Sequence, residues 1–206
     1  MSTTLRIIAA ILLLAACNNG NTTQGNDGNT TLNANLLSAA EEGNSEAQLR
    51  LALVYDAGRQ GYERNAVEAA RWYRAAARQG VAEAQNNLGV LYKDGDGLRQ
   101  DYGEAARWFT MAARQGNILA QSNLGWLYQA GKGVAQDYDS ARHWYLEAAR
   151  RGHPAAQNNL ATMYRDGQGV AQSLDSARYW FEQAARQGMK LAQRNLQKLD
   201  SMTHEH

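Results

Sequence analysis

Residues 82–97 read AEAQNNLGVLYKDGDG, and the same pattern returns as ILAQSNLGWLYQAGKG at residues 118–133 and as PAAQNNLATMYRDGQG at residues 154–169. A second pattern follows each of these stretches: EAARWFTMAARQG at 104–116, SARHWYLEAARRG at 140–152 and SARYWFEQAARQG at 176–188. The copies are 36 residues apart. A constant period of about 20–50 residues is typical of repeat proteins, so the chain is expected to stack copies of one small unit.

Each half of the repeat has the spacing of an amphipathic helix. In the first half, apolar residues recur at i, i+4, i+7 and i+8, as at Ala84, Leu88, Leu91 and Tyr92. The second half begins in every copy at a residue that caps helices well and ends at a glycine. The caps are Asn65, Asp101, Asp137 and Ser173, and the glycines are Gly80, Gly116, Gly152 and Gly188. The sequence therefore predicts an all-α fold of helix pairs, each buried only against its neighbours.

The combined pattern is A-x-x-L-G-x-x-Y, a glycine-rich turn, and then A-x-x-W-[FY]-x-x-A-A-x-x-G. It resembles the Sel1-like repeat, a relative of the tetratricopeptide repeat, and this resemblance implies a right-handed α/α superhelical solenoid. The repeat domain is expected at 32–200. It would hold a half-repeat at 33–44, four full repeats near 45–81, 82–117, 118–153 and 154–189, and a capping helix at 190–200. Residues 201–206 are expected to be a disordered tail.

The N-terminus reads MSTTLRIIAAILLLAAC at residues 1–17. One arginine, Arg6, precedes the apolar stretch 7–16, which is too short to span a membrane but suits the core of a signal peptide. Residues 14–17, Leu-Ala-Ala-Cys, resemble the bacterial lipobox. That resemblance implies that residues 1–16 are removed and that Cys17 carries a lipid anchor. An ordinary secretory signal followed by a chance cysteine is the alternative.

Residues 18–31, NNGNTTQGNDGNTT, contain almost no apolar side chain. Such a composition cannot bury enough surface to offset the entropy of ordering, so residues 17–31 are expected to be a flexible tether that begins at the lipidated cysteine. Asn18 stands where an aspartate would resemble a retention signal of the inner membrane. The expected location is therefore the outer membrane, with the folded domain facing the periplasm.

The sequence offers little for catalysis or for metal and cofactor binding. Its four histidines pair with no cysteine or carboxylate at ligand spacing, and nucleophile, Walker and H-E-x-x-H motifs are absent. Asp94-Gly-Asp96-Gly resembles a calcium loop, but Leu98 and Arg99 occupy the fifth and sixth positions, where an oxygen ligand and a glycine are needed. A formal net charge of +1 argues against binding to nucleic acid. The chain is not expected to be an enzyme.

A partner protein is expected on the concave surface, which the first helices of such solenoids usually line. With Leu88, Gly89 and Tyr92 taken as inward residues, their helix turns other positions towards this surface, and the copies differ there. A specific binding surface would show such divergence, and drift on a solvated face would show it too. The predicted binding residues are Leu49, Leu53, Asn86, Val90, Lys93, Ser122, Trp126, Gln129, Asn158, Thr162 and Arg165. Trp126 is the strongest candidate for an anchor, because tryptophan dominates many interfaces; packing against the next repeat is its other interpretation.

The leading functional prediction is a non-enzymatic interaction module, tethered to the bacterial envelope, that scaffolds or regulates a partner protein such as an envelope assembly component. A narrower alternative is an immunity lipoprotein that neutralises a type VI secreted phospholipase effector in the periplasm. A third alternative is a hydrolase acting on cell-wall or β-lactam substrates, which would need a pocket of titratable groups that the sequence does not show.

Overall fold

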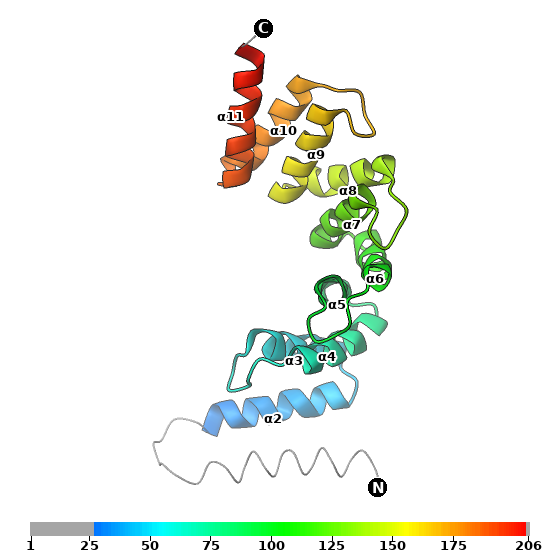
Figure 1. The fold of residues 1–206 in the computed structure, drawn as a ribbon. Helices are drawn as coiled ribbons and strands as arrows, with labels where there is room; N and C mark the ends of the chain where they lie inside the picture. Colours follow the sequence, from blue (N-terminus) through cyan, green and yellow to red (C-terminus); the bar gives the residue numbers. More distant parts are fainter. Residues whose placement is uncertain (1–26, 205–206) are drawn as a thin grey trace. The chain divides into compact units, whose positions relative to one another are not determined.

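The computed structural model describes residues 27–204, and the burial of side chains over residues 34–201. The predictions for residues 1–26, including the signal peptide, Cys17 and most of the tether, lie outside this range. Ten α-helices and no strand occupy the described part of the chain, which confirms the all-α prediction (Figure 1). None of these helices is both long and apolar enough to cross a membrane. They are α2 (Asp27–Glu41), α3 (Ser45–Ala57), α4 (Ala66–Arg78), α5 (Ala82–Asp94), α6 (Tyr102–Arg114), α7 (Ile118–Ala130), α8 (Tyr138–Arg150), α9 (Pro154–Asp166), α10 (Leu174–Arg186) and α11 (Lys190–His204).

Helices α3 to α11 pack in consecutive pairs, and all of them lie within one compact unit that begins at residue 36. The first helix of each repeat packs against the second helix of the same repeat, and each second helix packs against the first helix of the next repeat. The pairs are α3 with α4, α5 with α6, α7 with α8 and α9 with α10, and α11 then packs against α10 (Figure 1). This arrangement is a solenoid of helix pairs, as the repeat pattern predicts.

Local sequence signals set where the second helices begin. The backbone of each predicted cap is extended, and its side-chain oxygen accepts a hydrogen bond from an N–H of the first turn. The Asp101 carboxylate, for example, accepts from the Glu104 N–H at 3.0 Å. Such a bond satisfies a donor that has no partner inside the helix, so these caps hold the start of every second helix at the same place in the repeat.

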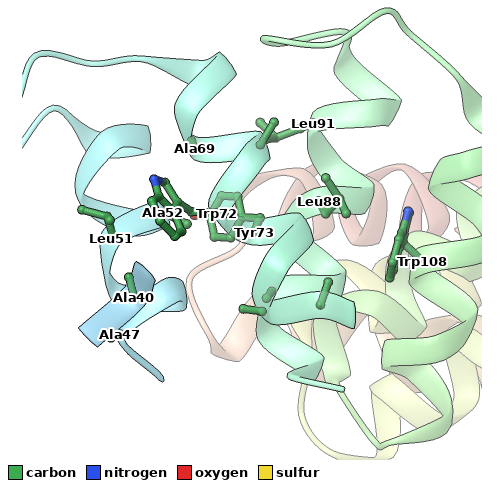
Figure 2. Close-up of a cluster of buried hydrophobic side chains, with 14 residues drawn as sticks. Ala40, Ala47, Leu51, Ala52, Ala69, Trp72, Tyr73, Leu88, Leu91 and Trp108 are labelled. Atoms are coloured by element: carbon green, nitrogen blue, oxygen red, sulfur yellow. The ribbon is translucent and has the colours of Figure 1, made fainter. Parts of the chain in front are cut away.

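The core lies between the stacked helices. Figure 2 shows the first cluster, in which Leu51, Tyr73 and Leu88 from three successive helices are completely buried. Burying one such leucine stabilises the fold by about 1.5–3 kcal/mol. The two helices of a repeat approach closely at Gly89, where an added Cβ would lie 2.7 Å from the ring of Phe109. The small residue in the first helix therefore makes room for the aromatic ring of the second.

Two helices extend beyond the expected bounds of the repeat domain. Residues 27–31, expected in the tether, belong to α2, and residues 201–204, expected in the tail, belong to α11. Adding a residue to an existing helix gains one hydrogen bond for each residue fixed, so helices extend past the segments that nucleate them. In α11 the Ser201 hydroxyl also donates to the carbonyls of Gln197 and Lys198, at 3.1 and 3.0 Å. No glycine or proline interrupts this helix.

Candidate binding surface

Three of the predicted binding residues are buried between first helices. Asn86, Ser122 and Asn158 occupy equivalent positions and are only 3%, 8% and 3% exposed. The Asn123 amide donates to the side-chain oxygen of Asn86 at 3.2 Å, and Asn195 donates to Asn158 in the same way at 2.9 Å. The two asparagines connect neighbouring repeats, and the burial of all three side chains leaves little of them for a partner to contact. Their recurrence as small polar residues at the same repeat position was the available sign that they are structural.

Near the C-terminal end of each first helix, Lys93, Gln129 and Arg165 have partners within the chain. Lys93 pairs with Asp94 at 3.4 Å, and Arg165 contacts both carboxylate oxygens of Asp166 at 2.6 and 2.8 Å. Gln129 accepts a hydrogen bond from the Tyr145 hydroxyl at 3.0 Å. A partner protein would have to compete with these local bonds, so these three positions are weaker candidates than the sequence suggests.

Two buried tyrosines explain why the residue at this position is a hydrogen-bond acceptor in the first and third repeats and a cation in the second and fourth. The Tyr73 hydroxyl donates to Asp56 at 3.0 Å, as Tyr145 donates to Gln129. Burial is the main cause that raises the pKa of both tyrosines, so both hydroxyls stay protonated and act as donors. In the second and fourth repeats the ring is Phe109 or Phe181, which carries no hydroxyl. The equivalent positions there are the cations Lys93 and Arg165, which bond to the adjacent aspartate instead.

The remaining predicted residues form a partly accessible row. We define the outward row as the equivalent positions Leu53, Val90, Trp126 and Thr162. Leu53 is 38% exposed, and the other three are half-buried. The Thr162 hydroxyl is used locally, because it donates to the Asn158 carbonyl at 3.0 Å. Leu49, on the same helix as Leu53, is half-buried against the first core cluster.

Trp126 packs against its neighbours, and it also keeps part of its ring accessible. Its ring packs against two of the core clusters and is half-buried. Around its outer part lie the ring of Tyr102, 6.3 Å away between centroids, and the ammonium of Lys132, 5.2 Å from the centroid of the indole. Lys132 also lies 5.0 Å from the centroid of Tyr102. We call Tyr102, Trp126 and Lys132 the Trp126 cluster.

The sequence did not single out Tyr102 and Lys132. Lys132 belongs to the turn after α7, and Tyr102 begins the second helix of the preceding repeat. The only sign was the divergence of the turn, which holds Asp96, Lys132 and Gln168 at one equivalent position. One exposed apolar residue, Leu119, lies two helical turns before Trp126 on the same face of α7 and is 52% exposed.

The described residues show no arrangement suited to metal binding. Between residues 27 and 204, no three histidine, cysteine, aspartate or glutamate side chains come together. The outward row and the Trp126 cluster offer rings, aliphatic groups and one ammonium. Such groups can hold a protein segment, because aromatic and aliphatic anchors dominate interface energies.

The model of one protein family, the Sel1 repeat, matches the chain four times, at residues 45–81, 82–117, 118–153 and 154–189. Solved structures agree. A crystal structure of c5321, a protective antigen present in uropathogenic Escherichia coli strains that displays an SLR fold, matches 78% of this chain with 37% identity and a TM-score of 0.75. A Sel1 repeat protein from Oxalobacter formigenes matches 78% with 37% identity and a TM-score of 0.73.

The matched region is only part of those proteins. It covers 34% of the Escherichia coli chain and 64% of the Oxalobacter formigenes chain. Helicobacter pylori cysteine rich protein B, at 21% identity and a TM-score of 0.50, shares the fold over 66% of this chain. The search of curated proteins gave no match.

Proposed function

The chain belongs to the Sel1 repeat family, and from that premise we propose that it binds a partner protein through the outward row while a lipid on Cys17 tethers it to a bacterial membrane. Proteins of this family are generally scaffolds for protein interaction, and the fold is generally not enzymatic. The proposal adds the binding face, the anchor and the periplasmic location to that general role.

One observation carries the choice of face. Inward positions of the first helices hold nearly the same residues in every copy, as Leu51, Leu88, Leu124 and Leu160 do, and all four are completely buried. The outward row varies from leucine to valine, tryptophan and threonine. Packing against identical neighbours explains the constant positions. Variation on the accessible face is what a surface shaped for one particular partner requires.

The anchor rests on the lipobox-like sequence at residues 14–17 and on the short apolar stretch before it. A lipid-tethered scaffold facing the periplasm suits an envelope assembly component as partner. It also suits a secreted phospholipase, which an immunity lipoprotein would meet at the membrane under attack.

The lipid can be tested by the intact mass of the full chain purified from detergent-solubilised cells. We expect cleavage before Cys17 and a diacylglycerol mass on the cysteine. Cys17→Ser should give no lipidated mature chain. A mature wild-type chain that is cleaved but carries no lipid would contradict the anchor.

The binding face can be tested with the same purified chain, immobilised and incubated with envelope and secreted proteins of the same bacterium. We expect one dominant partner on the wild type and its loss from Trp126→Ala. The matched control is Tyr179→Ala, since Tyr179 is an aromatic residue on a second helix that is 54% exposed. Equal retention by all three proteins would exclude the outward row, and retention of nothing would contradict the scaffold role. The identity of the partner would separate an assembly component from a phospholipase.

A further inference from the structure

The Trp126 cluster joins two repeats through a rigid contact. Gly133, directly after Lys132, has a positive φ of 71°, and an added Cβ there would overlap the carbonyl group of Tyr102. The turn after α7 is therefore pressed onto the first residue of α6. This contact fixes the backbone that carries Lys132 beside Tyr102, so the ammonium and the two rings form a preorganised group.

The turn that carries Lys132 differs in charge from the equivalent turn of the preceding repeat. Asp96, at the position equivalent to Lys132, forms an ion pair with Arg64 across the neighbouring turn. The position equivalent to Arg64 is Gln100, whose amide donates instead to the Lys93 carbonyl at 2.8 Å and to the Tyr102 hydroxyl at 3.2 Å. Among the described residues, the Lys132 ammonium lies over the rings of Tyr102 and Trp126 and has no carboxylate partner.

An exposed ammonium over aromatic rings is a site for a carboxylate. Rings stabilise the cation but neutralise none of its charge, and the side of Lys132 away from them faces solvent. Asp94 and Asp166, at the ends of the first helices before and after α7, are each paired with the cation next to them, so this surface offers no row of unpaired cations of the kind that binds a continuous polyanion such as nucleic acid. A protein segment with one or two carboxylates and an apolar neighbour fits this mixture of charges.

The apolar part of such a segment has a place beside the ammonium. Trp126 offers the exposed part of its indole, and Leu119 continues the apolar surface along α7. Seven residues of helix separate the two positions along the axis by about 10 Å. An extended segment covers that distance with about three residues, which can place one side chain on each position.

We propose that Tyr102, Trp126 and Lys132 dock an acidic segment of the partner protein, with a carboxylate on Lys132 and an adjacent apolar side chain on Trp126. This inference rests on the proposed scaffold function and names the chemistry of its partner. Lys132 selects the charge of the segment, and the two rings hold its apolar side chain.

The test is a selection of random peptides displayed on phage against the immobilised full chain. We expect enriched peptides that carry Asp or Glu next to Leu, Ile or Phe, and weaker binding at high salt. For the best synthetic peptide, Lys132→Gln should lower affinity about tenfold, because a hydrogen bond to a charged group is lost. Lys132→Glu should instead enrich peptides rich in Lys and Arg. The matched control, Lys198→Gln, changes an exposed lysine of α11 and should leave the affinity unchanged.

Thermal unfolding of each variant shows that the array is intact, which is expected because Lys132 is exposed. An unchanged acidic preference in Lys132→Glu would overturn the site, and peptides without acidic enrichment on the wild type would overturn the chemistry. Capture of the same partner protein by wild type and Lys132→Glu would refute this inference and leave the scaffold function standing. A wild-type chain that binds neither peptide nor protein would refute both.

Discussion

Arg151 stands where one repeat lacks a hydrogen bond that the other three repeats share. Within three of the four repeats, a glutamine after the second helix donates to the side-chain oxygen of a buried glutamine in the first helix; the donors are Gln79, Gln115 and Gln187, at 2.7–2.8 Å. Arg151 occupies the equivalent position and donates to the Gly116 carbonyl instead. The side-chain oxygen of Gln121 is left buried without a hydrogen-bond partner among the described residues.

Arg151→Gln should therefore stabilise the fold. Gln79 shows that one amide can reach both the equivalent carbonyl, at 2.9 Å, and the buried glutamine. A restored bond to a buried acceptor should add about 1 kcal/mol and raise Tm by about 2–4 °C. Thermal unfolding followed by circular dichroism measures this change. The reverse substitution, Gln115→Arg, should lower Tm by a similar amount, and a gain in both variants would contradict the explanation.

His153 makes the start of α9 sensitive to pH. Its Nδ1 accepts a hydrogen bond from the Ala156 N–H at 3.2 Å, which only the unprotonated ring can do. Burial lowers the pKa of His153 from its ordinary value near 6.5. The unfolded chain then binds the proton more readily than the folded one. The stability that His153 contributes is present above about pH 6.5 and is lost as the pH falls through its folded pKa.

His153→Asn should remove this part of the pH dependence. Asn117, the equivalent residue of the previous repeat, caps α7 by accepting from the Ala120 N–H at 2.9 Å and does not titrate. Between about pH 8 and about pH 5, wild-type Tm should fall further than the Tm of the variant, by up to the effect of one lost cap, about 1 kcal/mol. Parallel curves for the two proteins would show that His153 does not titrate in this way.

At the scale of the elements, the glycine-rich turn after a first helix packs against the start of the second helix of the preceding repeat. Gly97, Gly133 and Gly169 all have positive φ, and an added Cβ at any of them would overlap the start of the preceding second helix. Gly152 also has positive φ, at 87°, but an added Cβ there would meet no atom within 4 Å. Substitutions at the two kinds of glycine can therefore distinguish the cost of steric overlap from the cost of backbone strain.

Gly133→Ala should be far more damaging than Gly152→Ala. The alanine at 152 carries only the cost of a left-handed conformation, about 1–2 kcal/mol. At 133 the same cost is joined by overlap with a backbone that cannot move without displacing α6, so we expect a further loss of several kcal/mol. Equilibrium unfolding in urea compares the two variants. Equal losses would show that the turn does not pack against Tyr102 as described.

At the scale of the whole repeat domain, the helices contact others of the same or the adjacent repeat, so stability should be local. A substitution in the core of one repeat weakens that repeat and its interfaces, but it touches nothing further along the chain. The buried leucines Leu88 and Leu124 provide a matched pair, because they occupy the same position one repeat apart.

Leu124→Ala should cost about 2–5 kcal/mol, since it leaves a cavity where a fully buried leucine stood. Hydrogen exchange measured by mass spectrometry should show lost protection in α6, α7 and α8 and little change in α3. In Leu88→Ala the affected region should move one repeat towards the N-terminus, to α4, α5 and α6. A uniform loss over all helices in both variants would show instead that the domain unfolds as one cooperative unit.

Most of the fold could be predicted from the sequence because its signals are local and repeated. The caps at Asn65, Asp101, Asp137 and Ser173 bond to amides within three residues, and the apolar positions recur at one period. A cap works the same way in any context, and identical copies must stack in the same manner. Helix pairs and the family followed from the sequence alone, whereas the lipid anchor stays a prediction.

Only the tertiary structure decided which residues face solvent. Helical periodicity placed Asn86, Ser122 and Asn158 outward, but adjacent first helices bury them, because a helix packed on several sides has a narrow exposed stripe. Tyr102, Trp126 and Lys132 come from two repeats and meet because the turn at Gly133 is pressed onto α6. Periodicity describes one helix at a time, whereas burial and clustering depend on the distances between helices, which are set by how whole side chains pack.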